Sequence, residues 1–187
     1  MKALTPQAQG HLAMLAFSAL VAGSFSLGSR VANQIDPAAL TQMRFLIAAI
    51  GMAVLAAMGP GFRPAHFRGP WRWALLGGIY AIYFVLMLEG LKTASSVATA
   101  AVFTLSPLLS AGFGWLLLRQ VTTPRMALAI AVGASGALWV IFRADLAALL
   151  RFEVGRGEVI YFIGCIFHAA LPAAMRLTSR GEPQQIG

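Results

Sequence analysis

The chain contains six long stretches without a single Asp, Glu, Lys or Arg, at 3–29, 45–62, 73–88, 93–118, 126–142 and 159–175. A helix needs about 20 residues to cross a hydrocarbon core about 30 Å thick, and flanking Arg and Lys side chains can reach outward to the interface. Extending the shorter stretches into their flanks predicts six transmembrane helices, near 11–31, 38–58, 72–92, 95–118, 125–143 and 157–177. Lipid offers the backbone no hydrogen-bond partners and nothing here alternates like barrel strands, so we predict an all-α, polytopic transmembrane helical bundle.

The composition excludes most other classes of protein. Of the 187 residues, 59% are hydrophobic and 11% are charged, and the mean hydropathy is +0.77. A soluble domain has about 45–50% apolar and about 25% charged residues, so a soluble enzyme, a disordered chain and a coiled coil are excluded. The net charge of +8 does not indicate nucleic-acid binding, because the basic residues fall singly or in small groups between apolar stretches. The single cysteine, Cys165, lies inside an apolar stretch, so we expect no intrachain disulfide, metal site or cofactor.

The distribution of basic residues favours a cytoplasmic N-terminus. With that orientation the inner segments hold eight of them: Lys2, Arg63, Arg68, Arg72, Arg119, Arg125, Arg176 and Arg180. The outer segments hold five: Arg30, Lys92, Arg143, Arg151 and Arg156. Cytoplasmic loops carry the excess of Lys and Arg in membrane proteins. The first stretch also has features of a signal peptide, but the five spans that follow favour an uncleaved helix.

The sixth span begins as the first one does. Gly10-His11-Leu12 opens the first span, and Gly157-Glu158-Val159 opens the sixth, five spans later. An odd number of crossings per unit means that a second copy starts on the opposite side of the membrane. Such inverted-topology repeats are typical of many secondary transporters.

Several motifs resemble those of the EamA domain of the drug/metabolite transporter superfamily. The most specific segment is Leu91-Lys92-Thr93-Ala94-Ser95-Ser96-Val97-Ala98, continuing to Leu105-Ser106-Pro107-Leu108 and Trp115-Leu116-Leu117-Leu118. Arg44-Phe45 in the second span also fits. The resemblance implies a cytoplasmic tail at 1–10, a first five-helix repeat at 11–143, an outer loop at 144–156, and the first helix of a second, incomplete repeat at 157–187.

The chain departs from the family pattern in two places. Family members often carry Gly-Glu just after the fourth span, where this chain has Arg119-Gln120, so no role of a glutamate is carried over. The family normally has ten spans in two repeats, so the resemblance implies that this chain is the front part of a longer transporter. The alternative is a six-span protein that pairs with itself as a homodimer, or with a partner.

Arg44 is the most unusual residue of the spans. It lies about 9 Å inside the second span, at 1.5 Å per residue, and a charge kept at such a depth usually faces a cavity or a partner. Glu89 lies near the same outer side. Three alternatives follow: an Arg44–Glu89 contact, separate extension of each side chain to the interface, and attraction of an anionic substrate group by Arg44.

Two tyrosines mark one face of the third span. Tyr80 and Tyr83 share this face with Met87, at i, i+3, i+7 spacing. They are suited to hold an amine or an aromatic substrate by cation–π and hydroxyl contacts; the alternative is packing with one hydroxyl satisfied. Glu89 falls about 180° from Tyr80 on a helical wheel, so we expect the tyrosines rather than Glu89 to face a cavity.

The fourth span carries a proline on a face of small and polar residues. Ser96, Phe103 and Pro107 share this face, with Thr99 at its margin. Pro107 removes one backbone donor and frees the carbonyl of Phe103. The face therefore predicts a substrate path or a bending point, or else a packed kink repaired by a neighbouring hydroxyl.

The sixth span repeats the pattern, because Pro172 frees the carbonyl of His168. An intramembrane histidine can relay protons in an exchanger; the alternative is a hydrogen bond to a neighbouring helix.

Transport is the predicted function. We expect a carrier that moves a small polar metabolite, an amine or an amino-acid-like compound, by alternating access. The resemblance implies that the carrier lies in the bacterial inner membrane and works as an exporter. Proton coupling through His168 or Glu89 stays open. The alternative is a truncated or assembly-dependent membrane subunit without transport activity of its own. An intramembrane enzyme is not favoured, because His11, His66 and His168 lie on different segments and no acid sits deep in a span.

Overall fold

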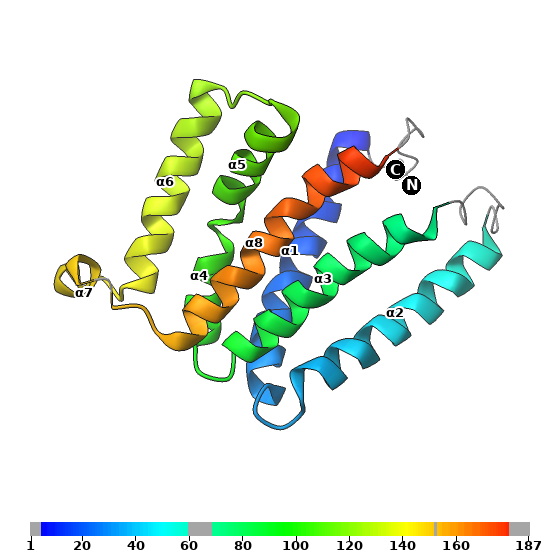
Figure 1. The fold of residues 1–187 in the computed structure, drawn as a ribbon, viewed down its shortest axis with the longest axis horizontal. Helices are drawn as coiled ribbons and strands as arrows, with labels where there is room; N and C mark the ends of the chain where they lie inside the picture. Colours follow the sequence, from blue (N-terminus) through cyan, green and yellow to red (C-terminus); the bar gives the residue numbers. More distant parts are fainter. Residues whose placement is uncertain (1–4, 60–68, 152, 180–187) are drawn as a thin grey trace.

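The computed structural model describes residues 5–59, 69–151 and 153–179, and within these ranges it contains helices and no strand (Figure 1). Six helical segments are long and apolar enough to cross a membrane, which confirms the all-α, six-span prediction. The elements are α1 (Pro6–Val31), α2 (Pro37–Met58), α3 (Pro70–Gly90), α4 (Ser96–Phe103), α5 (Ser106–Leu118), α6 (Pro124–Ile141), α7 (Leu146–Leu150) and α8 (Arg156–Thr178).

Several helices begin with a capping residue followed by proline. Asp36 precedes Pro37, and its Oδ1 accepts from the Ala38 and Ala39 N–H groups at 3.0 Å each. Proline fits the first helical position because its missing N–H would have no partner there. The same pairing of Thr5 with Pro6 starts α1 at Pro6. The first helix is therefore longer than the predicted 11–31.

The fourth span is not the continuous helix expected over 95–118. It breaks between Phe103 and Ser106, where the Thr104 and Leu105 N–H groups turn back to carbonyls of α4. Pro107 lies in the first turn of the next helix. The Thr104 hydroxyl donates to the Ala101 carbonyl at 2.7 Å, so it does not repair the carbonyl of Phe103. The bending point is thus present. The predicted outer loop at 144–156 also contains a short helix, α7.

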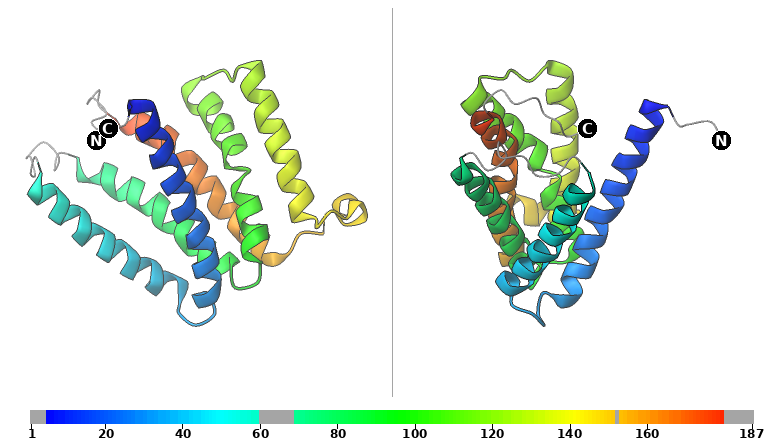
Figure 2. Two further views of the ribbon diagram at one scale, coloured as in Figure 1. Left: turned by 180° about the vertical axis from the view of Figure 1, so that it is seen from behind. Right: turned by 90° about the vertical axis from the view of Figure 1, so that its right-hand side faces the viewer.

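Helix α8 lies between α3 and α5. It packs most extensively on α3, and it also contacts α5 and α4 (Figure 1). Helix α2 lies beyond α3, and α6 packs on α4 and α5. Helix α1 packs mainly on α4, and its N-terminal end leans away from the other helices (Figure 2, right). The buried core accordingly forms where α1, α3, α4 and α8 meet.

Two glycines allow the closest helix crossing. At the end of α3, a Cβ on Gly90 would lie 2.7 Å from the Gly157 carbonyl oxygen and 2.9 Å from the Tyr161 Cβ. At the start of α8, a Cβ on Gly157 would lie 2.6 Å from both the Ala94 nitrogen and the Thr93 Oγ1. Neither position has room for a side chain, so the two backbones are in direct contact, as small residues permit in membrane helices.

Candidate functional site

A small cavity lies among α1, α3, α4 and α8. Its volume is about 60 Å³. The residues that line it are Phe17, Val21, Ser24 and Phe25 of α1, Tyr80, Tyr83, Phe84 and Met87 of α3, Phe103 of α4 and His168 of α8. The helical spacing of Tyr80, Tyr83 and Met87 therefore placed them correctly on one face. The walls are aromatic, with a few polar atoms.

His168 is packed by aromatic rings. Its ring centroid lies 4.7 Å from that of Tyr83, 5.1 Å from that of Phe103 and 6.1 Å from that of Tyr80. His168 Nδ1 is buried and has no hydrogen-bond partner among the described residues. The imidazole is thus brought to the predicted tyrosines and to Phe103, and it carries a free polar atom.

Sequence reasoning missed Tyr161, which completes this cluster. The Tyr83 and Tyr161 hydroxyls lie 3.0 Å apart and share a hydrogen bond between α3 and α8. Tyr83 is 5% exposed and Tyr161 is fully buried. A signal was present, since Tyr161 stands seven residues before His168, on the same face of one helix. The chain has three tyrosines, and all of them meet here.

Arg44 reaches the outer side of the same cluster. Its guanidinium carbon lies 4.9 Å from the centroid of the Phe84 ring, which is cation–π geometry. Phe84 in turn contacts Tyr80 and Tyr83 edge-on, with centroids 5.2 Å and 5.0 Å apart. A fixed positive charge therefore stands behind one wall of the cavity.

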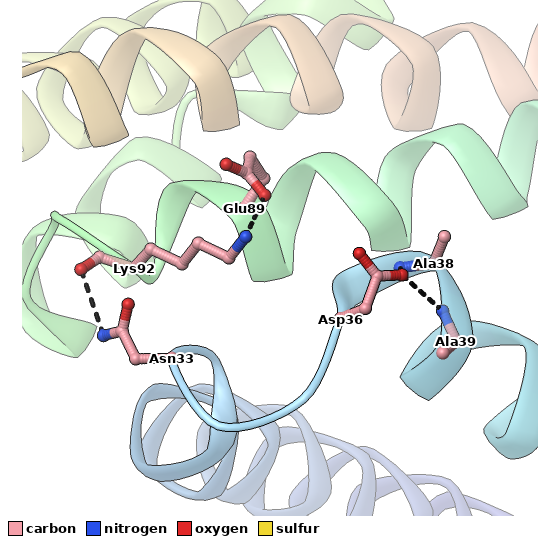
Figure 3. A network of polar contacts seen from close by, with 6 residues as sticks. All are labelled: Asn33, Asp36, Ala38, Ala39, Glu89 and Lys92. Carbon is pink, nitrogen blue, oxygen red and sulfur yellow. Dashed lines mark hydrogen bonds and ion pairs between the residues drawn. The ribbon is translucent and has the colours of Figure 1, made fainter.

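Glu89 does not contact Arg44, because it has a nearer cation. Its carboxylate pairs with Lys92 at 2.7 Å, at the turn that follows α3 (Figure 3). Asn33, in the turn after α1, donates to the Lys92 carbonyl at 3.2 Å. Of the three alternatives for Arg44, the direct contact with Glu89 is therefore not the one in the structure, and Glu89 belongs to a polar group that joins two turns.

The remaining fourth-span candidates lie away from the cavity. Ser96 begins α4, and the Thr99 hydroxyl donates to the Ser95 carbonyl of its own helix at 2.8 Å. Pro107 lines a separate, larger groove of about 790 Å³ between α5, α6 and α8, together with Pro172. Of these four candidates, Phe103 alone is a wall of the aromatic cavity.

Comparison with known proteins identifies the family. The EamA-like transporter family matches residues 8–142. The chain belongs to this family. Over 160 residues the EamA chain is also 26% identical to an uncharacterized transporter, YyaM, of Bacillus subtilis (strain 168). The match covers 82% of this chain and 51% of YyaM, so the EamA chain spans about half the length of this curated relative. No solved structure matches the EamA chain.

Family membership makes the EamA chain a multi-pass membrane protein and points to a transporter rather than an enzyme. Within the described ranges, no three His, Cys, Asp or Glu side chains gather where they could hold a metal ion. Lys2, Arg63, His66, Arg68 and Arg180, which entered the sequence arguments about orientation and enzyme activity, lie outside the described residues.

Proposed function

We propose that this EamA chain forms the first part of a membrane transporter that moves a small organic solute by alternating access. The observation that carries the proposal is the aromatic cavity. Three helices of the family-matched segment, α1, α3 and α4, converge on it together with α8. Ligand sites are typically apolar hollows with a few convergent polar groups. Here those groups are the Tyr80 and Tyr83 hydroxyls and His168 Nδ1.

The solute enters when α1 moves. The present cavity of about 60 Å³ holds little more than a water molecule or two, so a solute needs one wall to withdraw. Helix α1 supplies that wall through Phe17, Val21, Ser24 and Phe25, and it is among the least buried of the spans. Loosely packed elements are the ones that open at low free energy. The break beside Phe103 gives α4 and α5 separate freedom.

The proposed direction is export, on family resemblance, with the N-terminus in the cytoplasm. The solute is an amine, an amino-acid-like compound or another small metabolite, and His168 or Glu89 is the candidate for proton coupling.

Counterflow in proteoliposomes tests the proposal without assuming a coupling ion. The full-length protein is reconstituted, loaded with unlabelled tyramine, L-phenylalanine, L-threonine or 3-phenylpropionate, and given the same compound in labelled form outside. We expect transient accumulation of at least one compound above protein-free vesicles. Phe103→Ala should lower the initial rate at least tenfold, whereas Phe113→Ala, on the same span but outside the cavity, should leave it within twofold.

The alternative of a subunit without its own transport activity has a distinct outcome. Inserted, correctly folded protein that exchanges none of these compounds, nor the two phenyl probes described below, contradicts the transporter proposal. Equal rates for Phe103→Ala and Phe113→Ala would place the solute path elsewhere.

A further inference from the structure

The position of Arg44 shows that its side chain extends sideways rather than to the membrane surface. Arg44 lies seven residues after the start of α2 at Pro37, and Phe84 lies six residues before the end of α3 at Gly90. The two helices are antiparallel neighbours, so the start of α2 and the end of α3 lie on the same side of the bundle. Both residues therefore lie about 10 Å from that side, at 1.5 Å per residue. The Arg44 guanidinium, 4.9 Å from the Phe84 ring centroid, therefore lies at about the depth of its own Cα and is directed at the aromatic cluster.

Among the described residues, no acidic side chain forms an ion pair with Arg44. The five acids within the described ranges all lie at helix ends or in turns: Asp36, Glu89, Asp145, Glu153 and Glu158. Four of them are engaged there, since Asp36 and Asp145 cap helices while Glu89 and Glu153 pair with Lys92 and Arg151. An unbalanced positive charge at membrane depth favours an anion from outside the chain.

The aromatic walls argue against a cationic solute at this place. A cation would be held by the faces of the rings, but the Phe84 ring already contacts the Arg44 guanidinium. A second positive charge beside it would be repelled in surroundings of low dielectric. An anion is attracted by Arg44, can accept hydrogen bonds from the neutral hydroxyl and imidazole donors, and can place an apolar body against Tyr83 and Phe103.

We infer that the solute of this cavity is an organic monoanion, with its charged group directed to Arg44 and an apolar body among the aromatic rings. The inference rests on the proposed transport function and narrows its substrate class from small organic metabolites in general, amines included, to carboxylates or similar anions. Arg44 is then the residue that selects the charge of the solute.

Two phenyl probes of similar size and opposite charge test the selection of charge. We compare counterflow of 3-phenylpropionate and of 2-phenylethylamine in the same proteoliposomes, at a pH where the first is an anion and the second a cation. We expect the anion to exchange at least tenfold faster. Arg44→Gln should remove that preference, Arg44→Lys should keep most of it, and Arg30→Gln, at the exposed end of α1, should leave it unchanged.

A binding measurement guards against variants that insert poorly. In nanodiscs, 3-phenylpropionate should raise the melting temperature of the wild type and of Arg44→Lys but not of Arg44→Gln. Exchange of the amine as fast as the anion would overturn the inference and leave transport standing. So would exchange of tyramine, L-phenylalanine or L-threonine with neither phenyl probe, or an unchanged preference in Arg44→Gln. Absence of exchange for every compound would instead contradict the proposed function.

Discussion

The hydroxyl pair of Tyr83 and Tyr161 joins the wall of the cavity to the core. Each ring is buried, and each hydroxyl has the other as its partner across α3 and α8. A buried hydroxyl without a partner is unfavourable in a helix interface, so the two tyrosines stabilise the fold only as a pair.

Tyr161→Phe should therefore destabilise the protein although it removes one oxygen atom. The Tyr83 hydroxyl loses its partner, and hydrogen bonds between membrane helices contribute about 0.6–1.7 kcal/mol. We expect a loss of that size in the free energy of unfolding, measured by denaturant titration in detergent. Tyr80→Phe is the control, because the Tyr80 side chain is already 36% exposed and should change stability by less than about 0.5 kcal/mol. Equal effects of the two variants would show that the Tyr83–Tyr161 bond has no special weight.

Residue-level prediction succeeded where one helix decided the outcome. The spacing of Tyr80, Tyr83 and Met87 fixes their common face, whatever the helix packs against. The partner of Arg44 could not be predicted in this way, because it depends on the rotation of α2 relative to α3. The partner of Glu89 was within reach of the sequence, since Lys92 follows it at i+3, a spacing that brings side chains together on a helix surface.

At the scale of helices, the crossing of α3 and α8 depends on the absence of side chains at two positions. A methyl group on Gly90 would overlap the backbone of α8, so the helices must separate and lose contacts along their length.

Gly90→Ala should lower the free energy of unfolding by about 1–3 kcal/mol, the usual range for overpacking. Gly78→Ala on the same helix is the matched control. A Cβ at Gly78 meets nothing within 4 Å, so helix propensity should make that variant up to about 1 kcal/mol more stable. Thermal unfolding of both proteins in one detergent measures the difference. A Gly90→Ala protein as stable as Gly78→Ala would mean that the two helices do not cross this closely.

The helices themselves were predictable because each is marked by the absence of charge and often by a capping residue and proline. Their exact starts were less so, as Thr5-Pro6 shows for α1. The interruption before Pro107 was foreseen as one of two outcomes, since proline removes a hydrogen bond without deciding whether the helix bends or breaks. Helix α7 was not predicted; it follows the cap Asp145 within a segment taken as a loop.

At the scale of the whole molecule, both described ends, at the start of α1 and the end of α8, lie at the same end of the bundle (Figure 1). This follows from an even number of spans. Because both ends lie on one side, the fold alone does not determine which side is cytoplasmic. That orientation is predicted from the basic residues, many of which lie in the loops.

Labelling of single cysteines should decide the orientation. Cys165 is the single cysteine of the sequence and is fully buried, so Cys165→Ala removes the native thiol and gives a background without a reactive one. Into it we place Val121→Cys, between α5 and α6, or Leu150→Cys, in α7; these positions are 85% and 86% exposed and lie at opposite ends of the spans. In intact cells, a membrane-impermeant maleimide should label Leu150→Cys and should label Val121→Cys only after permeabilisation. The reverse pattern would place the N-terminus outside.

The position of α8 between α3 and α5 was beyond sequence reasoning. Its first residues were expected to open a second repeat, and periodicity describes which face of a helix is apolar but not which helices cover it. Six spans of similar hydropathy allow many packing orders, and the structure selects one in which α8 contacts α3, α4 and α5.

That position has a consequence for biosynthesis. The family-matched segment ends at residue 142, yet Tyr161 and Cys165 of α8 are fully buried among its side chains. During translation, the surfaces of α3, α4 and α5 that pack on α8 thus stay exposed to lipid and to chaperones until α8, the sixth span, is inserted. The segment that the family match delimits and the length of chain needed to bury the core, which includes α8, are consequently different lengths of the same polypeptide.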